Sequence, residues 1–285
     1  MDSTPTTNNG QRSQRPIYII GDVHGQLKKL TMLLQRAKLI QNNLSWSGDA
    51  ATLWFLGDYV DRGPDGVGVI DLIMRLQHEA EVAGGHVGAL LGNHELFLLA
   101  AYRFGRRSTG LGSNFISYWK QNGGNPKDLK KLTRQHLEWL SALPSMALVE
   151  DTVLVHADAP VYIQHGRTIA DVNADFKKIM SRSDALTWEE LLEAFARRGA
   201  FSHTFGGDEF LSRFLDMYGG KRVVHGHTPI YFMRNIQPKS VTEAWTYADG
   251  RCVNVDGAMF LNAPGFVYQL PAETLHAPSE LLVDK

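Results

Sequence analysis

Hydrophobic and polar positions follow one pattern three times in the first third of the chain. Short apolar runs at 17–20, 52–56 and 86–91 each lead into a loop that contains glycine, and apolar residues then recur at helical spacing. Short continuous apolar runs are typical of buried parallel strands, and a 3.6-residue period is typical of amphipathic helices. Three strand–loop–helix units predict a mainly parallel α/β sheet, in which functional groups gather beyond the carboxyl ends of the strands.

The pattern is less regular after the third predicted helix, which covers 96–102. Residues 105–131 are rich in Gly, Asn, Ser and basic residues and predict a loop or a small helical excursion, followed by a helix over 132–143. Residues 146–155 predict a hairpin, and 171–218 is mostly helical and is a candidate cap over the sheet edge. From Arg222 onward, five runs with strand-like composition predict a second sheet packed on the first: RVVHG, IYFMR, RCVNVD, AMFLN and FVYQL.

Composition narrows the class of protein. The 285 residues include 29 Lys and Arg against 30 Asp and Glu, and 44% are hydrophobic, which excludes a disordered chain. The net charge of −1 gives no expectation of general binding to nucleic acid or to an anionic membrane. A single cysteine, Cys252, excludes an internal disulfide framework and a Cys-rich zinc site.

The chain is expected to form one domain over 16–272, because no internal repeat or Pro/Ser-rich linker divides it. Residues 1–15 are polar and predict a disordered tail, and 273–285 is expected to be a C-terminal tail. No run of about 18 apolar residues predicts a membrane span. The N-terminus has no apolar signal region, which favours a cytoplasmic location.

The three loops that follow the predicted strands carry the chemistry. They read GDVHG (21–25), GDYVDRG (57–63) and GNHE (92–95), and two later strand candidates end in His156 and His227. The side chains with metal-ligating atoms in these segments are Asp22, His24, Asp58, Asn93, His156 and His227. Carboxylate, amide and imidazole donors without thiolates suit manganese, iron or zinc, and six donors suit two ions that share a bridging carboxylate.

Each motif alone also has a structural explanation. GDVHG and GNHE can be helix starts in which Asp or Asn caps the helix, and a lone buried histidine is more often hydrogen-bonded than metal-bound. Independent capping does not explain why all three loops coincide with strand ends, nor why two strand-end histidines and the pair Asp61-Arg62 accompany them. The combination favours a metal site.

Together, GDVHG, GDYVDRG and GNHE resemble the signature of the PPP-type metallophosphoesterases, which have the calcineurin-like fold. The later HAD and GHTP segments resemble the bacterial and phage branch of that family. The resemblance covers roughly 17–270 and is strongest over the first 95 residues. It implies an α/β/β/α sandwich of two sheets with a helical excursion, and a site that binds two divalent metal ions, with manganese favoured.

The resemblance also implies a role for each matching residue. Asp22, His24 and Asp58 would hold the first metal, and Asp58 would bridge to the second, which Asn93, His156 and His227 would complete. His94 would be the general acid, Asp61 would orient its ring, and Arg62 would bind the phosphate. Attack on phosphorus by a metal-bridging hydroxide would need no phosphoenzyme.

Some assignments stay open at this point. A second phosphate-binding arginine is expected among Arg182, Arg197 and Arg198, and no motif selects one. His225 would point away from His227 on a strand and is interpreted as a neighbour. Asp256 either supports the site from behind the ligands or forms a simple Asp-Gly turn.

Three functions are compatible with these residues. The leading hypothesis is an enzyme that hydrolyses phosphoserine and phosphothreonine in proteins. The second is a symmetrical dinucleoside polyphosphate hydrolase, for which Arg103, Arg106 and Arg107 would contact the extra phosphates, although a solvated basic loop is the more common explanation for such a run. The third is a non-catalytic, metal-bound scaffold that binds phosphoproteins. A scaffold of this kind would be expected to lack a ligand or His94, and the sequence lacks neither.

Overall fold

A computed structural model describes residues 15–110, 112–182, 184–203, 206–270 and 273–276. The predicted tail at 1–15 therefore lies almost wholly outside the described residues. The strands are β1 (Ile17–Ile20), β2 (Thr52–Phe55), β3 (His86–Ala89), β4 (Met146–Val149), β5 (Thr152–Val155), β6 (Arg222–His225), β7 (Trp245–Tyr247), β8 (Cys252–Asn254), β9 (Phe266–Leu270) and β10 (Glu273–His276).

The α-helices are α1 (Leu27–Arg36), α2 (Gly66–Val82), α3 (Asn93–Phe104), α4 (Phe115–Gln121), α5 (Pro126–Lys131), α6 (Arg134–Ala142), α7 (Ile169–Ser181), α8 (Ala185–Phe195), α9 (Gly207–Tyr218) and α10 (Ile230–Arg234). The described residues also form the short 3₁₀ helices η1 (Pro160–Gln164), η3 (Pro238–Ser240) and η4 (Met259–Leu261). None of the helices in the described part of the chain has both the length and the apolar content that crossing a membrane requires.

The strands form two five-stranded sheets, in the orders β10-β9-β1-β2-β3 and β4-β5-β6-β8-β7. The predicted parallel pairing of β1, β2 and β3 and the β4–β5 hairpin are confirmed. In the second sheet β5, β6 and β8 run parallel, so the carboxyl ends of β5 and β6 point to the same edge. The candidate ligands follow β1, β2 and β3 in the first sheet and β5 and β6 in the second. They therefore lie at the edge of each sheet where the carboxyl ends of these strands meet.

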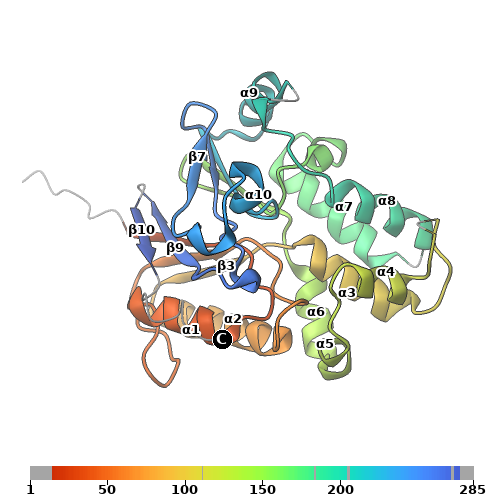
Figure 1. Cartoon of the computed structure of the whole chain (residues 1–285), viewed down its shortest axis with the longest axis horizontal. Helices are drawn as coiled ribbons and strands as arrows, with labels where there is room; N and C mark the ends of the chain where they lie inside the picture. The colour runs from red at the N-terminus through yellow and green to blue at the C-terminus, as the bar shows by residue number, and fades with distance from the viewer. Residues whose placement is uncertain (1–14, 111, 183, 204–205, 271–272, 277–285) are drawn as a thin grey trace, which may run out of the picture.

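Alternation along the strands explains how the layers pack. Ile19 of β1 and Leu154 of β5 belong to one apolar cluster between the sheets, whereas Ile20 and Val153 belong to a second cluster that includes the helices. In Figure 1, α1 and α2 lie together on one side, and α3 to α8 group at the end of the molecule away from β10. The predicted α/β/β/α sandwich with a helical excursion is confirmed, and α4 and α5 form part of that excursion.

Two predicted strands are wrong. The run IYFMR forms helix α10, because it follows the turn at Pro229 and its first N–H donates to Asp256 O at 3.1 Å. The run AMFLN forms η4, flanked by Ala258 and Asn262 in the left-handed region, where a strand cannot continue. Strand β10 falls within the range expected to be a C-terminal tail, and it extends the first sheet by pairing with β9.

Candidate active site

The three motif loops meet beyond the carboxyl ends of β1, β2 and β3. The backbone N–H groups of Val23 and His24 donate to Asp58 O at 3.1 and 2.8 Å, which joins the first loop to the second. The third loop joins them through His94 N, which donates to Asp58 Oδ1 at 3.0 Å. A Cβ atom on Gly92 would lie 2.3 Å from Asp58 Oδ1, so only glycine allows this approach.

The structure brings all six predicted metal ligands together, and each is almost fully buried. Two groups of side chains have ligand atoms within 4.8 Å of one another: His24, Asp58 and His94 form one, and Asp58, His156 and His227 form the other. Asp58 belongs to both groups, as a bridging carboxylate would. Asp22 lies beside the first group, with Oδ2 4.0 Å from His24 Nε2.

Hydrogen bonds to main-chain carbonyls fix which nitrogen of each histidine faces the site. His24 Nδ1 donates to Val60 O at 3.0 Å and His156 Nδ1 donates to Leu56 O at 2.9 Å, which leaves each Nε2 as an acceptor. His156 Nε2 and His227 Nδ1 then both face Asn93 Oδ1, each at 2.9 Å. Acceptors that converge on one point repel one another unless a cation lies among them, so this donor set fits a metal ion.

Charge and burial in the site favour the same conclusion. Burial, together with the charges of Asp256 and Asp58, raises the pKa of Asp22 well above its usual value. Burial lowers the pKa of His24 and of His227 well below the usual imidazole value, and the nearby arginines lower them further. Burial opposes ionisation of Asp58, but the surrounding imidazoles, His156 first, hold its pKa well below the usual range. Neutral imidazoles at His24 and His227 are the protonation state that metal ligands need, whereas the raised pKa of Asp22 means that this buried carboxylate needs a cation beside it to stay ionised.

The backbone at the site is held in an unfavourable conformation. His24, Asp58, Asp61, Arg62 and His227 all have φ between 45° and 66°. Non-glycine residues adopt this left-handed region at a cost, and such residues concentrate at functional sites where the surrounding structure holds them. The tight turns at these residues are therefore held by the surrounding structure and not only by the glycines of the motifs.

His94 is held by a carboxylate on the side away from the metal ligands. Its Nδ1 lies 2.9 Å from Asp61 Oδ2, so Nδ1–H donates to Asp61 and Nε2 faces the site. Trp119 of α4 donates its Nε1–H to the same carboxylate at 2.8 and 2.9 Å, and Asn125 N donates to Asp61 Oδ1 at 3.3 Å. The excursion at 105–131 thus helps to position the predicted acid, and no sequence motif marked Trp119 for this contact.

Glu95 is a second residue whose role sequence analysis missed. Its side chain is fully buried and accepts hydrogen bonds from Asp58 N at 2.8 Å, Tyr59 N at 2.7 Å and Gly92 N at 2.9 Å. Burial and the negative charge of Asp58 raise the pKa of Glu95 to about 8, although these N–H groups lower it. Glu95 therefore fixes the second loop to the third. The position of Glu95 in the GNHE motif was the one sequence signal that could have indicated this role. Sequence analysis interpreted that motif only as a possible helix start.

Two arginines face the site from opposite loops. The Arg62 guanidinium lies 2.6 Å from His24 Nε2 and 3.0 Å from His94 Nε2. Arg198 donates to His227 O and to Thr228 Oγ1, and both arginines line one pocket of about 230 Å³. Asp158, two residues after His156, holds the segment of Arg198 by accepting from Gly199 N at 2.8 Å. Of the three arginines left open by the sequence, Arg198 is the one that the structure brings to the site.

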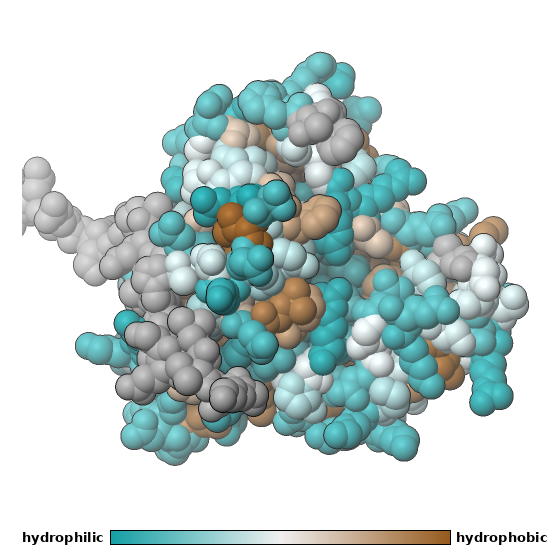
Figure 2. All heavy atoms as spheres, viewed as in Figure 1, coloured by the Kyte–Doolittle hydropathy of each residue, from teal (hydrophilic) through white to brown (hydrophobic). Residues whose placement is uncertain are grey.

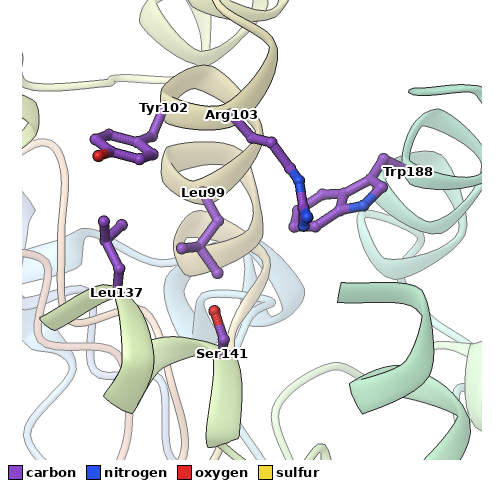
Figure 3. Close-up of a pocket in the computed structure, with 6 residues that line it drawn as sticks. All are labelled: Leu99, Tyr102, Arg103, Leu137, Ser141 and Trp188. Atoms are coloured by element: carbon purple, nitrogen blue, oxygen red, sulfur yellow. The ribbon is translucent and has the colours of Figure 1, made fainter. Parts of the chain in front are cut away.

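The other basic candidates lie elsewhere. Arg182 and Arg197 do not line the pocket that Arg62 and Arg198 share. Arg103 donates to Met180 O and, at 3.2 Å, to Ser181 O, and its guanidinium lies 5.7 Å from the Trp188 ring centroid. Figure 3 shows Arg103 extending toward Trp188 in a separate pocket of about 370 Å³, lined also by Leu99, Tyr102, Leu137 and Ser141. The Arg103 side chain therefore packs against Trp188 of α8 and does not face the candidate active site.

The two neighbouring residues that the sequence singled out are both buried. His225 Nε2 lies 2.8 Å from Tyr247 Oη and its Nδ1 lies 2.9 Å from Gly226 O, so it belongs to neither ligand group. Asp256 accepts from Ala258 N at 2.9 Å, which is the turn that the sequence allowed. Burial raises the pKa of Asp256 to about 6. Its charge is also the second cause of the raised pKa of Asp22, so the turn and the site are linked.

Comparison with known proteins identifies the class. The family model for calcineurin-like phosphoesterases matches residues 15–231, which include all the residues of both ligand groups. The chain belongs to this family and is a phosphoester hydrolase, as the PPP-type resemblance implied.

Named relatives fall into two groups. Shewanella-like protein phosphatase 1 of Plasmodium berghei is 26% identical over 74% of this chain, and the match covers only 60% of that relative. A symmetrical bis(5′-nucleosyl)-tetraphosphatase of Salmonella arizonae is 28% identical over 89% of this chain and 85% of the relative.

Solved structures share the fold. The cold-active protein-tyrosine phosphatase of a psychrophilic Shewanella species superposes with a TM-score of 0.68 at 22% identity, covering 92% of this chain and 80% of that one. A protein serine/threonine phosphatase from Saccharomyces cerevisiae gives a TM-score of 0.56 at 17% identity, covering 95% and 82%. At these identities the superpositions establish the fold alone.

Proposed function

We propose that this chain hydrolyses phosphomonoesters, with phosphoserine and phosphothreonine residues of proteins as its substrates. The observation that carries the proposal is one small pocket lined by both Arg62 and Arg198, in which the Arg62 guanidinium also lies 3.0 Å from His94 Nε2. Two guanidinium groups suit the oxygens of a single phosphate, and the pocket offers no further cation among its lining residues.

The residues suggest the following chemistry. When bound, two divalent ions would supply Lewis-acid polarisation of the phosphoryl group and a lowered pKa for the attacking water. Asp22, His24, Asp58, Asn93, His156 and His227 would hold them. We propose manganese, with iron or zinc also compatible with these donors.

The proton for the leaving group would come from His94. As water attacks phosphorus, the bond from phosphorus to the serine or threonine oxygen breaks, and that oxygen takes the proton from His94 Nε2. Asp61 accepts from Nδ1 at 2.9 Å and so holds the ring with Nε2 facing the site. Arg62 and Arg198 would bind the equatorial oxygens, where negative charge is spread in the transition state.

A second candidate is symmetrical hydrolysis of diadenosine tetraphosphate. It is favoured by the tetraphosphatase match, which covers 85% of that relative against 60% for the protein phosphatase. It is disfavoured by Arg103, whose guanidinium is occupied by main-chain carbonyls away from the site.

The test compares kcat/KM of the Mn²⁺-reconstituted protein on a phosphothreonine peptide and on diadenosine tetraphosphate. We expect a clear preference for the peptide. A clear preference for the dinucleotide would reject the proposal in favour of the second candidate.

A further inference from the structure

The pocket that Arg62 and Arg198 share also has aromatic walls. It is lined by Arg62, Arg198, Pro229, Tyr231, Phe232 and Phe260, none of which is acidic. The aromatic residues come from α10 and η4, the two segments for which the predicted strands were wrong. The metal ligands and the general acid do not need these rings.

The ring of Phe260 joins this pocket to the reacting groups. It lies 4.4 Å from Arg62 Cζ, in a cation–π contact, and its centroid is 5.0 Å from that of the His24 ring, edge to face. An aromatic surface thus lies beside both the phosphate-binding arginine and a metal ligand. A substrate whose phosphate is bound by Arg62 would place its neighbouring atoms against this surface.

Phe232 leaves apolar area open on the other side of the pocket. Its side chain is 68% exposed, although it borders a cavity that also contains Tyr231 and two guanidinium groups. Single exposed apolar residues are ordinary, but an exposed phenyl ring at the mouth of an active site is positioned to cover a ligand. Figure 2 shows an apolar patch near the middle of this face, where α10 lies in Figure 1.

Size and charge restrict what this surface accepts. The pocket measures about 230 Å³, which is smaller than sites for drug-sized ligands and is suited to one ring system. Its two arginines favour an anion immediately next to that ring. A substrate that uses both the arginines and the rings would carry its phosphate and its aromatic ring only a few bonds apart.

We propose that this surface, the ring pocket, binds an aromatic side chain directly next in sequence to the phosphorylated residue. The chain would then prefer phosphoserine or phosphothreonine flanked by Phe, Tyr or Trp. This inference rests on the proposed function, because it assumes a peptide substrate.

The experiment uses phosphothreonine peptides that differ at one flanking position, before or after the phosphothreonine, which is Phe, Leu or Ala. We expect the Phe peptide to exceed the Ala peptide in kcat/KM by about tenfold at one of the two positions, mainly through KM. Leu should give a smaller gain, because it is apolar but cannot stack. Phe232→Ala should bring the Phe-to-Ala ratio close to one, and Phe232→Trp should keep it.

Tyr102→Ala is the matched control, because Tyr102 is also an exposed aromatic residue, 54% exposed, but lines the separate pocket shown in Figure 3. It should leave the ratio at the wild-type value.

Equal kcat/KM for all peptides, or a ratio unchanged in Phe232→Ala, would overturn the ring pocket and leave the proposed function standing. Failure to hydrolyse any peptide while p-nitrophenyl phosphate is hydrolysed would reject the proposed function. If a preference for an aromatic ring appears only when AMP is compared with ribose 5-phosphate, and not among the peptides, the ring pocket would be assigned to a nucleobase instead of a side chain.

Discussion

Replacing Glu95 with glutamine tests whether one buried carboxylate holds the metal-binding loops together. In the wild type, Oε2 accepts from Asp58 N and Gly92 N, and Oε1 accepts from Tyr59 N at 2.7 Å and from Val60 N at 3.4 Å. A glutamine has one oxygen and one NH₂ group, so it can satisfy one pair of donors and must direct N–H groups at the other pair.

The magnitude follows from that count. Each buried N–H left without an acceptor costs about 1–3 kcal/mol, so two of them predict a loss of about 2–6 kcal/mol. For a chain of this size, such a loss lowers Tm by on the order of 10 °C. The second loop carries Asp58, which belongs to both ligand groups, so metal affinity should fall by about 10–100-fold as well.

The assay, run above the Glu95 pKa of about 8 so that this carboxylate is ionised, combines thermal unfolding of the metal-free protein with calorimetric titration of Mn²⁺. Glu209→Gln is the matched control, because the Glu209 side chain is 82% exposed, and it should change neither quantity. A Glu95→Gln protein that unfolds within about 1 °C of wild type would refute the hydrogen-bond argument. Normal stability with weakened metal binding would show instead that the charge of Glu95 matters rather than its contacts.

Three further outcomes are expected. His94→Asn should lower kcat by about 100-fold or more while elemental analysis shows normal metal content, and near wild-type kcat would eliminate the acid role. Asp58→Asn should lose both metals, because Asp58 is common to the two ligand groups, and full occupancy would contradict bridging. Burial raises the pKa of the Cys252 thiol to about 12, so below that pH the folded protein keeps a proton that the unfolded chain loses near pH 8.5. Alkylation of native protein by iodoacetamide at pH 8 should therefore be slow and become fast in denaturant, and equal rates would contradict burial of the thiol.

The arrangement of the first sheet could be predicted because local and global signals agree there. The apolar runs at 17–20, 52–56 and 86–91 coincide with β1, β2 and β3, and the ligands follow each strand within a few residues. Parallel strands align their carboxyl ends, so spacing along the sequence was enough to predict that these side chains lie together.

The later segments could not be predicted because composition and hydrogen bonding disagree there. The run at 230–234 has strand-like residues, but five residues are too few for a helical period to show. At 258–262, the Asp256 side chain accepts from Ala258 N and closes a turn, which overrides the apolar composition. Both departures depend on Asp256, whose main-chain oxygen also accepts from Ile230 N. Asp256, which sequence analysis interpreted as either a turn or a support for the site, thus contacts both walls of the ring pocket, one through its side chain and the other through its main chain.

The selection of Arg198 over its neighbours shows what tertiary contacts add to a motif. Arg197 and Arg198 are adjacent, and nothing local distinguishes them. Asp158 accepts from Gly199 N through its side chain and from Ala200 N through its main-chain oxygen, which fixes the direction of the chain just after Arg198. Asp158 follows the candidate ligand His156 by two residues, so the loop that presents this candidate ligand also fixes which arginine lies beside it. The HAD segment therefore both presents His156 and positions the segment of Arg198. The second role depends on Gly199, more than 40 residues away, so no spacing within the motif can indicate it.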